Sequence, residues 1–316
     1  MAFGMESTTD EVLEGIDLSG TWVLVTGASA GLGQETARAL AARGANLVLG
    51  VRDVGKGERA AEPVRAAAAD AGGEVERRAV APASLASVRA FTDGVSADHD
   101  HLDVLVANAG VMGCPFATTA DGFEMQFGTN HLGHFVLVNR LRPLLANAPR
   151  SRVVNLSSAG HRFGDVDLDD PGFARTPYDP WTAYGRSKTA NVLFSVELDR
   201  RGRAGGLRSC AVHPGGIVTE LGRHITDESL KALEERRGER KATWKSVPAG
   251  AATSVWAGFV APADAIGGRY CEDCGVAEVT DDPSSATGVF AYAVDPASAA
   301  ALWARSEELV GESFPE

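Results

Sequence analysis

Short apolar runs alternate along the chain with longer, Ala-rich stretches in which apolar residues recur at helical spacing. The first apolar run, WVLVTG at residues 22–27, predicts a buried strand. The stretch QETARALAARG at residues 34–44 predicts a helix that Gly44 ends. Further strands are predicted at residues 45–52, 75–81, 102–110, 152–158, 207–216 and 267–272. Further helices are predicted at residues 55–73, 84–99, 122–148, 182–202 and 296–312.

This alternation predicts an α/β fold, with a doubly wound parallel sheet that helices cover on both faces. Because no linker or change in composition divides the chain, we expect an N-terminal arm at residues 1–20 and a single domain at residues 21–316. Two irregular inserts, at residues 159–181 and 220–247, interrupt the pattern. Ligands of such folds bind at the carboxyl ends of the strands, where we expect both inserts to lie.

The composition narrows the classes of protein to consider. Hydrophobic residues make up 44 % and charged residues 23 % of the 316 residues, which is typical of a soluble globular protein. We find no apolar run of ~18 residues, so we expect no membrane span, and MAFGMESTTDEVLEG at the N-terminus lacks the apolar core of a signal peptide. Four cysteines do not suggest a disulfide framework, which favours the cytoplasm. A net charge of −12 disfavours nucleic-acid binding, because phosphate backbones repel an acidic protein.

A glycine-rich turn, TGASAGLG at residues 26–33, joins the first predicted strand to the first predicted helix. Glycine lets the backbone approach a pyrophosphate, and the start of the helix offers free N–H groups and a positive dipole end. A tight turn without a ligand is the alternative. The position of the turn in the first strand–helix–strand unit favours a bound dinucleotide.

Several further motifs stand in register with this turn. They are ANAG at residues 107–110, Asn130, a serine ahead of AYGRSK, and HPGGIVTEL at residues 213–221. Their order and spacing resemble the short-chain dehydrogenase/reductase family along almost the whole chain. LVLGVRD, NHLGHF and GRYCEDC resemble its retinol-dehydrogenase-like and WW-domain-oxidoreductase-like branch. The resemblance implies a Rossmann-type fold and an oxidoreductase that uses a nicotinamide cofactor to interconvert a ketone or aldehyde and its alcohol.

Tyr184 and Lys188 stand four residues apart in a predicted helix, which places them on one face. A free tyrosine has a pKa near 10, and a neighbouring ammonium stabilises the phenolate, so we expect a lowered pKa for Tyr184. Such a tyrosine can exchange a proton with a substrate oxygen. The resemblance assigns Tyr184 this role and gives Lys188 a second one, which is to bind the nicotinamide ribose. The alternative is a surface pair without a shared function.

The resemblance adds Ser158 and Asn130 to the predicted catalytic set. Ser158 would hydrogen-bond the substrate oxygen and orient it, and Ser157 is the fallback assignment. Asn130 would hold water and connect Lys188 to solvent; a buried Asn bonded to neighbouring backbone is the alternative. We expect His131 and His134 to be exposed or packed side chains rather than metal ligands, and we predict no metal site.

The resemblance also implies a set of residues that contact the cofactor in addition to Tyr184 and Lys188. They are Gly27, Ser29, Gly31, Leu32, Gly33, Asn108, Ala109, Gly110, Pro214, Gly215, Ile217 and Thr219. Of these, Asn108 and Gly110 are expected against the adenosine ribose. Ala81 stands where the family commonly has an Asp that touches adenine, so the adenine contacts are not predicted.

The end of the second predicted strand bears on which nicotinamide cofactor is used. Enzymes that prefer NAD usually carry a carboxylate there, but this chain has Val51. Arg52 follows, and a guanidinium suits the 2′-phosphate of NADP. If the strand is displaced by a residue or two, Asp53 could bind a ribose hydroxyl instead. We therefore expect NADP, with NAD as the alternative.

Substrate and partners are less clearly marked. Phe163, Trp181 and Leu221 suggest a hydrophobic small-molecule substrate, or they simply pack in the protein. In the family the charged segment at residues 223–241 covers the substrate and moves; a static surface helix is the alternative. The apolar surface of the helices at 122–148 and 182–202 favours a homodimer. Cys271 and Cys274 form one C-x-x-C, which we interpret as an incidental pair rather than a zinc or redox site.

Two rival functions keep the same cofactor. A sensor or scaffold that binds the dinucleotide without turnover would explain the glycine turn and Arg52, but not the Ser-Tyr-Lys set. A reductase of C=C bonds would differ in its product.

Overall fold

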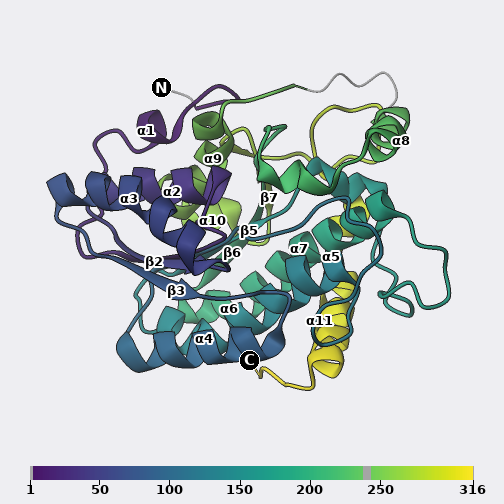
Figure 1. Ribbon diagram of the computed structural model, residues 1–316, viewed down its shortest axis with the longest axis horizontal. Coiled ribbons are helices and arrows are strands. Elements are labelled where there is room, and N and C mark those ends of the chain that lie inside the picture. Colours follow the sequence, from purple (N-terminus) through teal and green to yellow (C-terminus); the bar gives the residue numbers. More distant parts are fainter. Residues whose placement is uncertain (1–2, 238–242, 316) are drawn as a thin grey trace.

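The computed structural model describes residues 3–237 and 243–315, and within them eight strands form a single sheet (Figure 1). The strand order is β3-β2-β1-β4-β5-β6-β7-β8; all neighbouring pairs are parallel except β7 and β8. The strands are β1 Trp22–Thr26, β2 Asn46–Val51, β3 Val75–Ala79, β4 Val104–Ala107, β5 Arg152–Leu156, β6 Arg208–His213, β7 Tyr270–Glu272 and β8 Gly275–Val276. The order reverses between β1 and β4, and the crevice at such a point is where this kind of sheet binds ligands.

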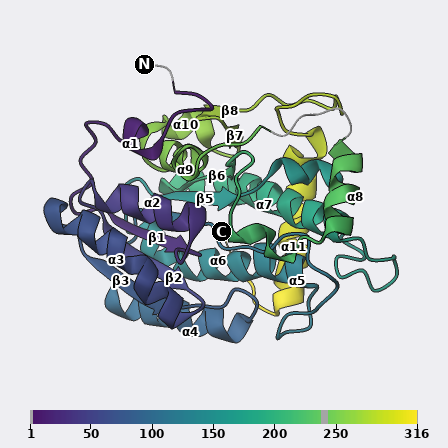
Figure 2. The same ribbon diagram turned by 45° about the horizontal axis from the view of Figure 1, so that its top comes forward.

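Helices cover both faces of the sheet, as the sequence predicts (Figures 1 and 2). One face carries α2 Gly31–Ala41, α3 Val54–Ala71, α9 Val247–Val255 and α10 Ala263–Ile266. The other face carries α4 Leu85–Asp98, α6 Gly133–Ala146, α7 Pro180–Gly202 and α11 Pro296–Val310. The fold is therefore a doubly wound, Rossmann-type α/β fold. No described helix is both long enough and apolar enough to cross a membrane.

Alternating strand side chains build the two halves of the core. In β1, Val23 and Val25 pack with α2 and α9, whereas Leu24 packs with the helices of the opposite face. All three are fully buried. Side chains of a strand point alternately to the two faces, so a parallel strand in the middle of the fold must be apolar at every position. This explains the uninterrupted apolar runs in the sequence.

The predicted elements are found, with shifted ends that local contacts explain. The helix expected from residue 182 begins at Pro180, because the Asp179 carboxylate accepts the N–H of Thr182 at 2.7 Å. Ser84 caps α4 as predicted. The helix expected at residues 122–148 is interrupted: α5 Met125–Phe127 and α6 flank a π-helical turn at Gly128–Leu132. A π-turn inside a helix often marks a functional site.

Among the α-helices and strands of the described residues, four had no prediction: α1 Thr9–Val12 in the N-terminal arm, α9, α10, and the edge strand β8. Val12 and Leu13 of the arm are buried in the core beside α2 and α9. The charged segment at residues 223–241 contains the helix α8 Asp227–Arg237, and its last residues lie outside the described part of the chain.

The C-terminal helix α11 covers the apolar surface of α6 and α7. Trp303 packs edge-on against Phe135 at a centroid distance of 5.1 Å and lies 5.8 Å from Phe194. Phe314, just after α11, lies 5.6 Å from Phe135. The Arg201 guanidinium lies 4.3 Å from the centre of the Trp303 ring. The surface from which the sequence favours a dimer is thus buried within one chain.

We therefore expect a monomer in solution. A helix that already buries the apolar faces of α6 and α7 leaves little to gain from a partner subunit there. Light scattering at micromolar concentration should give a mass near 32.9 kDa. Twice that mass would contradict this expectation. If a Trp303 variant then changed the measured mass, the surface formed by α6, α7 and α11 would be the one that joins the subunits.

Candidate active site

Ser158 and Tyr184 meet at the carboxyl end of β5. Ser158 is still extended and caps the short 3-10 helix Ala159–Phe163, and its hydroxyl oxygen accepts the N–H of Gly160 at 3.0 Å. Gly160 passes so close to the Tyr184 ring that a Cβ there would lie 2.6 Å from Cε1. A glycine two residues after the serine is therefore what lets the turn pack on the tyrosine, a role that the sequence analysis did not assign.

The Tyr184 side chain is buried, with 4 % of its surface exposed. Trp181 packs edge-on against the Tyr184 ring, and Leu233 of α8 belongs to the same buried cluster. Burial raises the pKa of Tyr184 to about 12, and a hydrogen bond with the Ser158 side chain opposes the rise. The lowered pKa expected from the sequence is therefore wrong for the protein alone, because loss of solvent disfavours the phenolate more than its neighbours favour it.

Lys188 lies one turn along α7, on the same face as Tyr184. Its Nζ donates a hydrogen bond to the Leu156 carbonyl at 2.9 Å and lies 5.7 Å from the centre of the Tyr184 ring. Only 4 % of Lys188 is exposed, and burial lowers the pKa of its ammonium to about 8. A buried lysine is costly for the fold, so its presence beside a buried tyrosine suggests a functional role.

The two neighbouring serines have different partners. The Ser157 hydroxyl donates to the Lys188 carbonyl at 2.9 Å and so faces the backbone of α7. Ser158 instead hydrogen-bonds with Tyr184. The geometry favours Ser158 over Ser157 as the residue that orients a substrate oxygen.

Asn130 lies in the π-helical turn and is completely buried. Its Oδ1 accepts the N–H of Val111 at 2.8 Å, and its Nδ2 donates to the Val111 carbonyl at 3.0 Å and to Ser187 Oγ at 2.9 Å. A Cβ on Gly110 would lie 3.1 Å from Asn130 Oδ1 and 3.8 Å from Lys188 Nζ. The amide thus holds the loop after β4 against α7, with Gly110 between it and the lysine.

The two histidines beside Asn130 pack in different places. His131 Nε2 lies 2.8 Å from Ser306 Oγ in α11, and His134 Nε2 lies 2.9 Å from Thr26 Oγ1 at the end of β1. Burial lowers their pKa values to about 3 and about 4, so both rings are neutral at physiological pH. Both rings are packed in the core, which is one of the two possibilities that the sequence left open.

The glycine turn between β1 and α2 has the geometry of a dinucleotide site. Gly27 and Gly31 have φ of 68° and 56°, which favour glycine, and a Cβ on Gly33 would lie 2.5 Å from the Gly27 carbonyl oxygen. Ala30 at the start of α2 offers no side-chain cap, so the first N–H groups of the helix are left for another acceptor. Ser29 and Leu32 lie half-buried in the same stretch. These residues fit the pyrophosphate of a nicotinamide dinucleotide.

Asn108 braces this turn from the end of β4. Its Nδ2 donates to the carbonyls of Thr26 at 2.9 Å and Gly27 at 3.3 Å. The Thr26 hydroxyl accepts the N–H groups of Asn108 and Ala109. The Asn108 Nδ2 is therefore engaged by the glycine turn, and the expected contact of Asn108 with the adenosine ribose stays a prediction.

The segment after β6 packs beside the same glycine turn. Pro214 and Gly215 form the turn, with a φ of 96° at Gly215. Ile217 packs near α9, where a Cβ on Gly250 would lie 2.6 Å from its Cγ1. Thr219 reaches the glycine turn: a Cβ on Gly31 would lie 3.3 Å from Thr219 Cγ2. Motifs far apart in the sequence are thus brought together at one edge of the sheet.

Lys245 is a neighbour of this turn that sequence patterns do not reveal. Its side chain lies so close to Gly215 that a Cβ on that glycine would be 2.8 Å from Lys245 Cδ and Cε. The Lys245 ammonium pairs with Asp273 in the β7–β8 turn. Asp273 and Cys274 both have positive φ there. The C-x-x-C is therefore the corner of a hairpin, with Cys271 and Cys274 buried in the core.

The residues at the end of β2 are the candidates to contact the 2′-position of the cofactor's ribose. Val51 is buried in the core, while Arg52 is exposed directly after the strand. Asp53 caps α3, and its carboxylate accepts the N–H of Lys56 at 2.8 Å. Since the Asp53 carboxylate is engaged by its own helix, it is less free to bind a ribose hydroxyl. The exposed Arg52 is the better placed of the two to contact the 2′-group of the cofactor.

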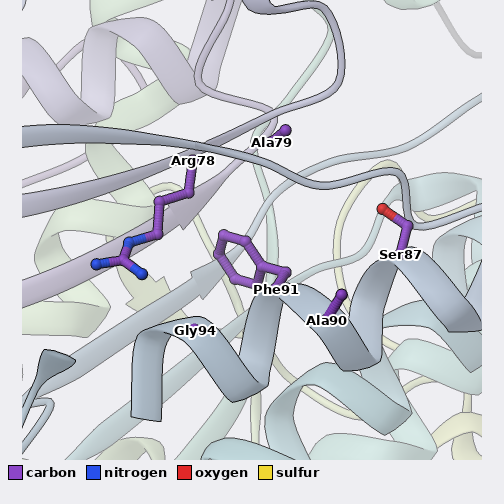
Figure 3. A pocket seen from close by; sticks show the side chains of 6 residues that line it. All are labelled: Arg78, Ala79, Ser87, Ala90, Phe91 and Gly94. Carbon is purple, nitrogen blue, oxygen red and sulfur yellow. The ribbon is translucent and has the colours of Figure 1, made fainter. Parts of the chain in front are cut away.

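A hollow of about 350 Å³ lies apart from all these residues, between the edge strand β3 and α4 (Figure 3). Arg78, Phe91 and Ser87 are among its lining residues. The Arg78 guanidinium is held by Glu76 and Asp98, both at less than 3 Å. The hollow contains none of the candidate catalytic groups.

Comparisons with known proteins agree with this geometry. The family model described as short chain dehydrogenase matches residues 21–230. This chain belongs to the short-chain dehydrogenase/reductase family. Proteins similar to it include one of Streptomyces lividans named "Probable oxidoreductase", 43 % identical over 91 % of this chain and 97 % of that one.

Retinol dehydrogenase 13 of Homo sapiens is 38 % identical over 94 % of this chain and 87 % of its own, which supports the retinol-dehydrogenase-like branch of the short-chain dehydrogenase/reductase family. A crystal structure of an uncharacterized protein from Mycobacterium Paratuberculosis aligns with a TM-score of 0.74 and 37 % identity, over 98 % of this chain and 100 % of that one. The region after residue 230, with β7, β8, α9 and α11, lies beyond the family model.

Proposed function

We propose that this chain is an NADP(H)-preferring oxidoreductase that interconverts a ketone or aldehyde and its alcohol on a hydrophobic small molecule. The observation that carries the proposal is the meeting of Ser158, Tyr184 and Lys188 at the carboxyl edge of the sheet, next to a glycine turn suited to a dinucleotide. A binding protein without turnover has no use for a lysine buried beside a buried tyrosine.

Each of these side chains has a distinct task in the proposed reaction. When bound, the dinucleotide supplies or accepts the hydride. Tyr184 exchanges the proton of the substrate oxygen, and a pKa of about 12 keeps its phenol protonated at neutral pH, which is the form needed to reduce a carbonyl. Ser158 donates a hydrogen bond to the same oxygen and orients it. Lys188 supplies positive charge that favours a phenolate as it forms.

The surroundings of Tyr184 support an apolar substrate. Trp181 and Leu233 pack with its ring, and Met112 and Phe163 border the same cluster. Leu233 belongs to α8, so a substrate bound beside Tyr184 would meet mainly apolar side chains. The name of one relative, retinol dehydrogenase 13, refers to an alcohol of this kind.

Product analysis tests the proposal. Purified protein is incubated with hydrophobic ketones, aldehydes and enones and either NADPH or NADH. We expect at least one carbonyl to yield its alcohol, with one NADPH consumed for each alcohol formed. Saturation of the C=C bond of an enone would favour the C=C reductase instead. NADPH binding without turnover on the whole panel would favour the sensor or scaffold.

Arg52→Ala should weaken the preference for NADPH. Removing a charge-assisted hydrogen bond costs about 1.5–3 kcal/mol, so kcat/KM for NADPH should fall roughly 10- to 100-fold while that for NADH changes little. The matched control is Arg65→Ala, which removes the same charge from an arginine on α3 that pairs with Glu58. Equal losses with both cofactors, or none with NADPH, would show that Arg52 does not select the phosphate.

A further inference from the structure

We propose that His161 is a positioning residue that holds Ser158 in place, and that residues 285–292 near the C-terminus hold His161. This inference rests on the proposed function, because it concerns the geometry of the serine in that reaction. The segment at residues 285–292 lies beyond the part of the chain that the family model matches.

The ring of His161 bridges the serine turn and this segment. Its Nδ1 lies 2.8 Å from the Ser158 carbonyl oxygen, and its Nε2 lies 3.2 Å from the backbone nitrogen of Phe290. A carbonyl can only accept a hydrogen bond and a backbone N–H can only donate one. Nδ1 must therefore carry the proton and Nε2 must accept, which defines a single neutral tautomer.

Burial keeps the ring in that state. His161 is completely buried, and its pKa falls to about 4 because the charged form loses its solvent. Tyr270 packs edge-on at 5.0 Å and Phe290 at 5.9 Å. The ring therefore acts as a fixed donor and acceptor at physiological pH and not as an acid or base in the reaction.

Further contacts attach the 285–292 segment to the same turn. The Tyr292 hydroxyl donates to the His161 carbonyl at 2.7 Å. Arg162, the next residue, donates to the Gly288 carbonyl at 2.7 Å, and its guanidinium lies 5.2 Å from the centre of the Phe290 ring. Gly288 in turn donates its N–H to Glu272 at 2.6 Å. The segment is thus bound to the turn by several contacts, of which only the His161 ring reaches Ser158.

Two hydrogen bonds of the His161 ring therefore connect Phe290 of this segment to Ser158. The Ser158 carbonyl accepts two hydrogen bonds from His161, one from the ring and one from the backbone N–H at 3.0 Å, while the Ser158 hydroxyl contacts Gly160 and Tyr184. Without the ring, the carbonyl keeps only the backbone hydrogen bond and the serine is held less tightly, and small misplacements of a positioning group lower the rate of catalysis strongly. Cofactor binding should be spared, because the glycine turn lies at the end of another strand.

The first experiment compares two substitutions of His161. Asn can place its amide near the position of Nδ1 and still donate to Ser158, whereas Leu fills a similar volume without a donor. We expect His161→Leu to lose roughly 10- to 100-fold in kcat and His161→Asn to recover most of that loss, with the Kd for NADPH unchanged in both. The proposal would be overturned if the two variants had equal kcat values, or if His161→Leu weakened NADPH binding and left kcat unchanged.

A second pair of variants remains informative if His161 variants fold poorly. Phe290 has φ of −72°, which proline can adopt, so Phe290→Pro removes the N–H that His161 accepts. Phe290→Ala loses the same ring but keeps the N–H. We expect kcat to be about three- to tenfold lower for Phe290→Pro than for Phe290→Ala. Equal kcat values would show that residues 285–292 do not hold His161 for catalysis. Wild-type turnover is measured alongside: its absence refutes the proposed function, whereas wild-type turnover with unaltered variants refutes only this inference.

Discussion

Tyr184→Phe should abolish carbonyl reduction while NADPH still binds. The substitution removes only the hydroxyl, so the ring keeps its contacts with Trp181 and with the turn at Gly160. Positioned acid–base groups contribute about 10²- to 10⁴-fold, and here the same group would also stabilise the developing oxygen charge. We expect kcat to fall at least ~10³-fold, with the Kd for NADPH within a factor of three of wild type by fluorescence titration.

Tyr270→Phe is the matched control for this change. Tyr270 is also completely buried, and its hydroxyl has no hydrogen-bond partner among the described residues. Losing an unpaired buried hydroxyl removes no favourable contact, so this variant should keep its activity and gain rather than lose stability. If Tyr184→Phe retained a tenth or more of wild-type kcat, another group would have to supply the proton.

Lys188→Met should give a protein that is more stable and nearly inactive. The folded protein holds this ammonium at a pKa of about 8, below its ordinary 10.5, because burial disfavours the charge. The shift corresponds to at most about 3 kcal/mol of cost at neutral pH, which methionine would not incur. The Leu156 carbonyl remains satisfied in the variant, because Asn191 Nδ2 donates to it at 2.9 Å.

The pH dependence of this gain has a defined sign. Below pH 8 the lysine is protonated in both the folded and unfolded states, so wild type bears the full cost. Between pH 8 and 10.5 the unfolded chain binds more protons than the folded one, so wild-type stability rises with pH relative to the variant. Urea unfolding at pH 7 and pH 10 should show the difference shrinking. A variant less stable than wild type at pH 7 would contradict this account.

The loss of activity in Lys188→Met should be about 10²-fold or more, as for other groups that stabilise charge in the transition state. Lys188→Arg separates charge from geometry, because a guanidinium keeps the positive charge but replaces the compact ammonium with a larger planar group. A gain in stability joined to a loss of activity is expected where a protein keeps an unfavourable group for its function. Full activity in the methionine variant would remove the lysine from the mechanism.

Much of the fold follows from signals that are local in the sequence. Apolar runs of strand length, helical spacing and caps such as Asp179 depend on residues only a few positions apart. The same holds for the pairing of Tyr184 with Lys188, which one helical turn places side by side. The glycine turn is recognisable for a similar reason, since its conformation needs glycine at particular positions. These signals identify the family and point to the proposed catalytic pair.

Other features depend on which segments meet in space, and no local pattern contains that information. The direction of the Tyr184 pKa shift comes from burial beneath Trp181 and Leu233, and the choice of Ser158 comes from where each serine hydroxyl points. The covering of α6 and α7 by α11 belongs to the same class.

His161 and Phe290 are 129 positions apart, yet one hydrogen bond joins them beside the serine. The sequence by itself determined which chemical groups this protein has, and the spacing of its residues determined on which helices and strands those groups lie. Only packing decided how far each group is removed from water and which distant partner holds it, because desolvation and contact are properties of the assembled core.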